Sequence, residues 1–167
     1  QTSYVEQKMQ VAKPLFNIGF KDTDIPKDPR ERDRRALIMG FINDILFSKS
    51  GELYTSLIER GLVSPGFSSC YSICQSFAFM ELAGEADDPR AALDEILAFI
   101  AKTKKKGIDQ ADFERLKKVY YAEWVMSFDS VEDIAEDLFR CVCEGTQLFE
   151  YVNILNEITP DDVKCAL

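Results

Sequence analysis

The sequence predicts a single α+β domain in which helices cover one face of a small β-sheet. Two observations support this prediction: a pair of helices between Asp88 and Ser127, and shorter segments before that pair in which apolar and polar residues alternate. Of the 167 residues, 46% are hydrophobic and 29% are charged, which is typical of a folded domain with its own core. We therefore expect residues 1–167 to form one two-layer α/β sandwich.

The central element is predicted to be two helices that meet at Gly107. Asp88 followed by Pro89 is a typical helix start, and Asp109 starts the second helix. Gly107 suits the left-handed conformation that ends a helix after a lysine-rich last turn. Apolar residues recur at helical spacing in both helices and predict the buried faces: Leu93, Ile96, Leu97 and Ile100, then Phe113, Leu116, Tyr120 and Trp124.

The strands are predicted from alternation. Tyr4 to Lys21 reads as extended, with Pro14 dividing it into two short strands or leaving one strand with an irregular point. Phe67–Tyr71 and Phe77–Ala83 read as a hairpin. Between these segments the spacing predicts helices over Arg30–Phe47 and Glu52–Arg60. We interpret the charged stretch from Arg30 to Arg35 as a solvated first helical turn.

Three more helices are expected after Ser127. The first runs from Ser130 to Gly145, and its predicted buried stripe is Ile134, Leu138 and Val142. A short apolar helix follows from Leu148 to Asn156, and Thr159 with Pro160 starts another.

The residue types limit the possible functions. The chain has no histidine, which excludes nucleophilic sites built on histidine, zinc sites with imidazole ligands and the commonest general base near neutral pH. A net charge of −9 argues against nucleic acid as a partner. Five cysteines, an odd number, indicate reduced thiols and a cytoplasmic protein. No membrane-spanning run or signal peptide is visible, although a leader could have been removed before Gln1.

Few residues are candidates for a site. Cys70 and Cys74 with Cys141 and Cys143 could in principle bind zinc as four thiolates, but their spacing favours ordinary buried or surface thiols. Trp124 is interpreted as a core or interface residue, and the many carboxylates as solvated or capping groups. We assign no catalytic, cofactor-binding or metal-binding residue to this chain.

Four segments carry a family resemblance. They are ILFSKSGELYTSLIERGL (Ile45–Leu62), DDPRAALDEILAFI (Asp87–Ile100), GIDQADFERLKKVYYAE (Gly107–Glu123) and EITPDDV (Glu157–Val163). In this order they resemble the homologous domain of the insulinase/pitrilysin family of zinc metallopeptidases, the inverzincins, and are most similar to the C-terminal half of a bacterial insulinase-like protein.

The resemblance implies that two such domains close around a peptide-binding chamber. Zinc is expected only in the N-terminal half, on an H-x-x-E-H helix, so this chain would be the non-catalytic half. The arginine and tyrosine that active relatives often supply from this half fall on Ile58 and on Ser64 or Pro65, so neither is kept. We expect this half to act through shape or packing.

Two alternatives remain open: a proteolytically inactive scaffold or protein-interaction module of the same fold, and a free-standing interaction domain. The resemblance also implies a final strand after the helix that begins at Thr159. Because the chain ends at Leu167, we expect a fragment of a longer chain that lacks this strand and self-associates through an open sheet edge or through the face that the strand would have covered.

Overall fold

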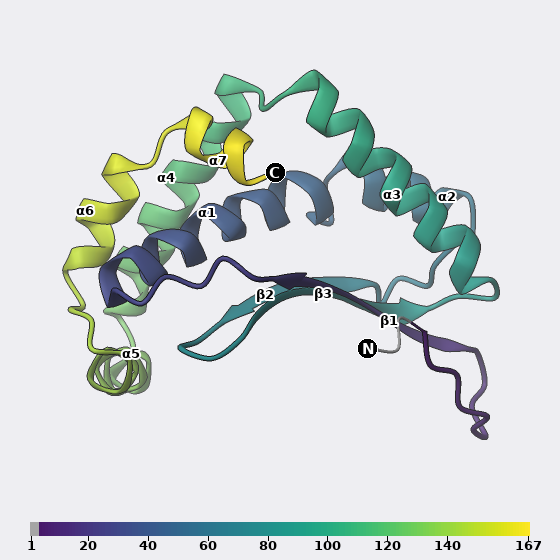
Figure 1. Ribbon diagram of the computed structural model, residues 1–167, viewed down its shortest axis with the longest axis horizontal. Helices are drawn as coiled ribbons and strands as arrows, with labels where there is room; N and C mark the ends of the chain where they lie inside the picture. Colours follow the sequence, from purple (N-terminus) through teal and green to yellow (C-terminus); the bar gives the residue numbers. More distant parts are fainter. Residues whose placement is uncertain (1–3) are drawn as a thin grey trace.

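The computed structural model describes residues 4–167 and has two layers, a sheet and a helical layer that covers one of its faces (Figure 1). The sheet has strand order β1-β3-β2, and both pairings are antiparallel. The strands are β1 (Leu15–Asp22), β2 (Ser68–Ile73) and β3 (Ala78–Glu85). The helices are α1 (Pro29–Phe47), α2 (Glu52–Glu59), α3 (Pro89–Lys106), α4 (Gln110–Ser127), α5 (Val131–Glu144), α6 (Glu150–Glu157) and α7 (Pro160–Ala166). The predicted fold class is therefore confirmed.

The core lies between the two layers. Alternate residues of β1, including Phe16, Ile18 and Phe20, pack against it from the sheet, and Met80 and Leu82 do so from β3. From the helical side, α1 packs on β2 and also contacts α4, α6 and α7. The largest fully buried side chains are Phe41, Phe67, Phe113, Leu53, Leu57, Leu82, Ile96, Ile154, Leu155, Ile158 and Val163.

The predicted helix starts are confirmed by their caps. The Asp28 and Asp88 side chains accept hydrogen bonds from backbone N–H groups of α1 and α3, and each is followed by a proline in the first turn. Asp109 caps α4 in the same way. Gly107 has φ +82°, a backbone conformation that favours glycine, so the two central helices do separate at this residue.

The prediction of strand structure before Pro14 is wrong. Residues 4–14 form no strand, and Val5 and Met9 are exposed. Alternation stabilises a strand only if a neighbouring strand pairs with it and a core covers its apolar side, and this segment has neither among the described residues. The later part of the predicted extended segment forms β1, and the hairpin forms as β2 and β3.

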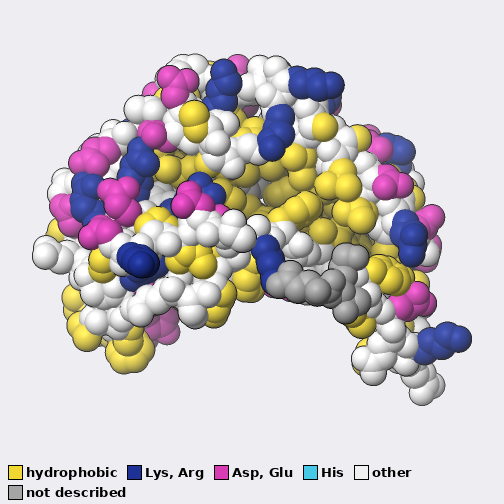
Figure 2. All heavy atoms as spheres, viewed as in Figure 1, with side chains coloured by type: hydrophobic (Ala, Val, Ile, Leu, Met, Phe, Trp, Pro, Cys, Tyr) yellow, Lys and Arg dark blue, Asp and Glu magenta, His cyan; other side chains and the backbone are white. Residues whose placement is uncertain are grey.

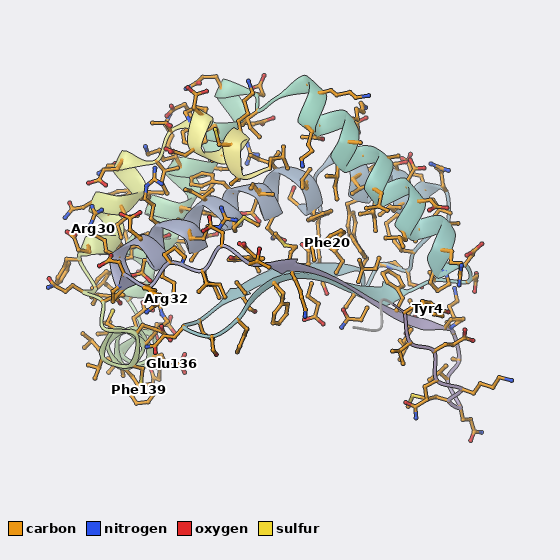
Figure 3. All side chains as sticks on the ribbon, in the orientation of Figure 1. Tyr4, Phe20, Arg30, Arg32, Glu136 and Phe139 are labelled. Carbon is orange, nitrogen blue, oxygen red and sulfur yellow. The ribbon has the colours of Figure 1, made fainter. Side chains whose placement is uncertain are left out.

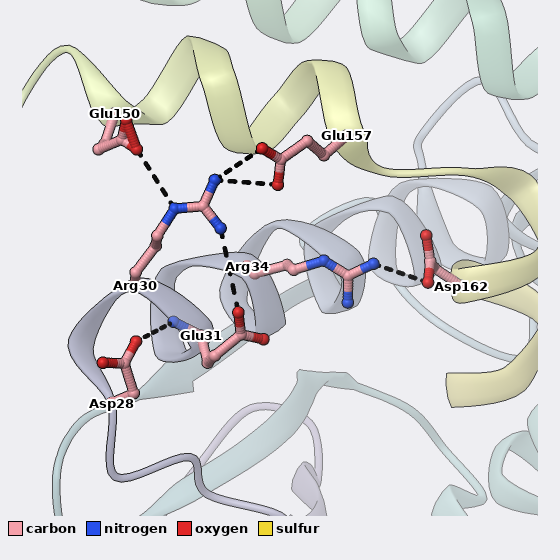
Figure 4. Close-up of polar contacts among 7 residues, drawn as sticks. All are labelled: Asp28, Arg30, Glu31, Arg34, Glu150, Glu157 and Asp162. Atoms are coloured by element: carbon pink, nitrogen blue, oxygen red, sulfur yellow. Dashed lines mark hydrogen bonds and ion pairs between the residues drawn. The ribbon is translucent and has the colours of Figure 1, made fainter.

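The interpretation of Arg30–Arg35 as a solvated turn is also wrong, because its four arginines form ion pairs with distant carboxylates. Arg30 bonds to Glu150 and Glu157 on α6, and Arg34 to Asp162 on α7 (Figure 4). Two further pairs are Arg32 with Glu144 and Arg35 with Asp22. We call these four arginines the arginine group; they join α1 to β1 and to the C-terminal helices.

Two predicted buried faces are only partly buried. Leu97 of α3 is exposed, and on α5 the expected stripe is turned mainly to solvent, since Leu138 and Val142 are exposed and Ile134 is half-buried. Within residues 4–167, no helix is long and apolar enough to cross a membrane.

Candidate functional site

The face of the sheet opposite the helices is open (Figure 1). Because side chains alternate along each strand, the residues between the core-facing positions point to this side. They are Asn17, Gly19 and Lys21 on β1, Phe79, Glu81 and Ala83 on β3, and Ser68, Cys70 and Ser72 on β2. We call this surface the open face; most of its side chains are small or polar, so an extended chain could approach it closely.

Glu81 lies at the centre of the open face. In the register, Gly19 of β1 and Cys70 of β2 are its neighbours on either side. Asn17 donates a side-chain hydrogen bond to the Glu81 carboxylate, which orients it. A Cβ added at Gly19 would meet nothing within 4 Å, so the space beside Glu81 is free. The centre of the open face therefore offers a carboxylate acceptor beside an unobstructed backbone.

The hairpin end of the open face is apolar. The rings of Phe77 and Phe79 stack with their centroids 5.7 Å apart, and Phe77 is exposed. In the adjoining turn, hydrogen bonds from Ser76 lower the pKa of the Cys74 thiol, while the negative charge of Glu144 at the end of α5 opposes this shift. The open face thus combines a polar centre with an aromatic end.

A charged cluster holds the end of β1 against the helical layer. Tyr71 Oη donates to Asp22 Oδ2 at 2.8 Å, and Arg35 Nε donates to the same oxygen at 2.9 Å. Arg35 Nη2 lies 2.9 Å from this oxygen in the same ion pair. Burial disfavours the Asp22 carboxylate, but hydrogen bonds from the Asp24 backbone, Tyr71 and Arg35 outweigh this, and the pKa of Asp22 is lowered. Burial and the neighbouring carboxylate raise the pKa of Tyr71. The cluster positions β1 and has no free nucleophile.

The sheet is open at its edges as well. β1 and β2 are the edge strands, and each pairs only with β3 among the described residues. Figure 2 shows a hollow between the sheet and the helices in which apolar side chains are visible. Phe20 and Ile100 are among the partly buried residues that pack against the core. An edge strand with unpaired backbone groups can accept a further extended segment.

A separate cavity of about 360 Å³ lies among the helices on the other side of the core. Gly40 of α1, Tyr120 and Trp124 of α4 and Arg140 of α5 are among the residues that line it. Tyr120 Oη donates to Asp44 Oδ2 at 2.7 Å, and the buried Trp124 Nε1 has no hydrogen-bond partner. Burial raises the Tyr120 pKa, so this hydroxyl stays protonated. The lining of the cavity is partly polar, and it includes the free thiol of Cys141.

The three positions at which active relatives are expected to supply arginine and tyrosine have structural contacts within this domain. Ile58 packs against the core from α2, Ser64 N donates to Glu85 O at 2.9 Å, and the Pro65 carbonyl accepts from Tyr54 Oη at 2.9 Å. Tyr54, one turn before Ile58, supplies a phenol that we did not single out from the sequence. The Tyr54 hydroxyl is already hydrogen-bonded within the domain, to the Pro65 carbonyl.

The cysteines are not assembled into a metal site. Cys70 lies on the open face and Cys74 in the hairpin turn, whereas Cys141 and Cys143 both lie on α5, the first buried and the second exposed. All five cysteines are free thiols. Among residues 4–167, no three His, Cys, Asp or Glu side chains lie close enough to hold a metal ion.

Three comparisons place this geometry among known proteins. Residues 1–120 match a family described as "Peptidase M16 inactive domain". The chain is 27% identical over 159 residues to the uncharacterized zinc protease YmfH of Bacillus subtilis (strain 168). The matched region covers 95% of this chain and 37% of YmfH.

Two solved structures share the fold. One is described as an M16-like peptidase from Alicyclobacillus acidocaldarius, with TM-score 0.82 and 23% identity over 93% of this chain and 37% of that chain. The other is pitrilysin, with TM-score 0.66 and 18% identity over 93% of this chain and 17% of that chain. The chain thus spans about a third or less of the length of these relatives.

Proposed function

The chain belongs to the family of peptidase M16 inactive domains, and from this premise we propose that it is the non-catalytic C-terminal half of a zinc-dependent peptidase and forms one wall of its peptide-binding chamber. The expected resemblance to the insulinase/pitrilysin family is confirmed. We also propose that the longer protein cleaves peptides and that a second, catalytic half completes it.

The observation that carries the proposal is the open face. In an antiparallel sheet the side away from the core is commonly solvated and carries polar residues. Here the second side is uncovered, lined by small residues such as Gly19 and Ala83, and marked by the Glu81 carboxylate and the exposed Phe77 ring. This combination suits an extended peptide, because peptide N–H groups could donate to Glu81 while apolar side chains contact the Phe77–Phe79 pair.

The catalytic metal would lie outside this chain. The described residues offer no set of ligands that fits zinc, so we derive no step that uses a metal from residues 4–167. The other half of the longer polypeptide would bind zinc and activate water, and this chain would position the substrate. We also propose a bacterial cytoplasmic protein, since five free thiols suit a reducing compartment.

One observation favours the second candidate, a proteolytically inactive scaffold. The positions where active relatives often supply arginine and tyrosine are Ile58 and Ser64 or Pro65 here, and the structure places no substitute side chain at the open face from these positions. A scaffold would bind peptides or proteins on the same surface without cleaving them.

The test is a substitution that blocks the open face without disturbing the fold. In the longer protein, Gly19→Trp should lower kcat/KM for peptide cleavage by about tenfold or more, since the indole would occupy the free space beside Glu81. Val119→Trp on the exposed side of α4 is the matched control and should leave cleavage unchanged. Equal activity in both variants would contradict the chamber wall, and peptide binding without cleavage in the parent would favour the scaffold.

A further inference from the structure

Helix α5 turns its most apolar side to solvent. Val131, Leu138, Phe139 and Val142 lie on one side of the helix at helical spacing, and we call them the α5 stripe. Their exposed fractions are 78%, 48%, 71% and 81%. A surface helix normally directs its apolar side to the core. Four large apolar side chains this exposed on 14 residues of helix indicate a surface that another element covers.

Contacts on the inner side of α5 fix the rotation of the helix about its own axis. It carries the buried Cys141 and the half-buried Asp137, Ile134 and Glu144, and it faces the polar cavity. Arg32 on α1 donates to the Glu144 carbonyl and carboxylate, both at 3.1 Å. Rotating α5 to bury its stripe would break these bonds and leave Arg32 without its partners, so the observed orientation is fixed by polar contacts.

The stripe faces the same side of the molecule as the open face. Figure 1 shows α5 beside the hairpin end of the sheet, and Figure 3 shows Phe139 at the side of α5 that points away from the helical layer. The apolar patch is visible at the lower left in Figure 2. A body that covers the open face at its hairpin end would therefore also reach the α5 stripe.

We propose that the α5 stripe is the docking surface for the part of the longer polypeptide that lies outside this chain, which would hold the two halves together at the hairpin end of the open face. The inference rests on the proposed function, because it takes the second body to be the other half of the peptidase. The length supports it: this chain is about a third of the relatives that it matches, so most of such a polypeptide is available to cover the stripe.

Charge defines the chemistry of the docking partner. Glu132 and Glu136 flank the stripe on the Phe139 side, and the whole chain carries a net charge of −9. The matching surface should therefore be apolar with a rim of lysine or arginine. A second copy of this chain would bring an identical acidic rim against the first, which disfavours self-association through α5.

Cys143 provides the test, because it is exposed and lies one helical turn after Phe139. We would compare its rate of alkylation in the longer protein with its rate in residues 1–167 alone. Docking predicts at least about a tenfold slower reaction in the longer protein. Phe139→Asp combined with Val142→Asp should restore the fast rate there, yet leave the Tm of residues 1–167 unchanged because both side chains are exposed. Val119→Asp on α4 is the matched control and should restore nothing.

Equal alkylation rates in the two proteins would overturn the inference. Protection that appears in residues 1–167 alone and grows with concentration would assign the stripe to a second copy and also overturn it. Failure of the proposed function looks different: Cys143 would be protected in the longer protein, while Gly19→Trp would have no effect on peptide cleavage.

Discussion

Replacing Arg32 with methionine should destabilise the domain more than any other change in the arginine group. The Arg32 side chain is only 6% exposed. Its Nη1 donates to the Pro26 and Lys27 carbonyls, both at 3.3 Å, and its Nη2 to the Glu144 carbonyl and carboxylate. Arg32→Met keeps most of the apolar volume and removes all four contacts, so the effect measures the polar bonds and not a cavity.

The expected loss of unfolding free energy depends on how far the Glu144 carboxylate is left without a partner. Removing one partner of a buried ion pair costs about 3–5 kcal/mol, but the Glu144 side chain is 30% exposed and water can replace part of the lost bonding. We therefore expect Arg32→Met to lower the free energy of unfolding by about 3 kcal/mol. Arg34→Met is the matched control: its pair with Asp162 is less buried, and the loss should be about 1 kcal/mol.

Urea unfolding followed by far-UV circular dichroism measures both variants. A double-mutant cycle with Glu144→Gln isolates the Arg32–Glu144 interaction, for which we expect a coupling energy of about 1–2 kcal/mol. If Arg32→Met were no more destabilising than Arg34→Met, the reasoning that burial makes these bonds costly to break would be refuted.

Three further predictions concern stability and the thiols. The pKa of Asp22 is lowered in the folded state, so its hydrogen bonds and ion pair stabilise the domain at pH above the ordinary value of 3.8, and this contribution is lost as the pH falls through the lowered pKa. Asp22→Asn should therefore flatten the acid side of a plot of unfolding free energy against pH. An unchanged acid side would argue against this role of Asp22. Phe113→Ala should cost about 3–5 kcal/mol in urea unfolding, because the ring is buried and stacks on Phe41 at 5.0 Å; a loss under about 1 kcal/mol would mean that the core can close around the gap. All five cysteines should react as free thiols in the denatured protein, and a mapped disulfide would contradict this. In the native protein, pH-dependent alkylation should give Cys74 an apparent pKa below that of an ordinary thiol, since hydrogen bonds from Ser76 lower its pKa; an ordinary Cys74 profile would contradict this.

The parts of the fold that sequence predicts well are those determined locally. Asp88 with Pro89, Asp109 and Gly107 specify helix ends through their own backbone and side-chain bonds, so the central helix pair could be placed correctly. β1 was predicted from its alternation, but the same alternation before Pro14 was misleading, because a strand also needs a neighbour to pair with.

The features missed are those that depend on distant partners. Arg30 pairs with Glu150 and Glu157, which are at least 120 residues away in sequence, and nothing in the local pattern distinguishes such an arginine from a solvated one. On α5 the periodicity predicted a buried stripe of Ile134, Leu138 and Val142, but Leu138 and Val142 are exposed, because periodicity does not say whether an apolar stripe faces the core or another body. The open face was not recognised at all, since its residues are ordinary and only the register of the strands brings them together.

Photo-crosslinking of a bound peptide in the longer protein tests the central claim most directly. A photoreactive amino acid placed at Lys21 on the open face should crosslink to the peptide, whereas one placed at Lys118 on the outer side of α4 should not. Crosslinking from position 118 and not from position 21, or from neither position while the peptide is bound, would contradict the assignment of the open face as the wall of the peptide chamber.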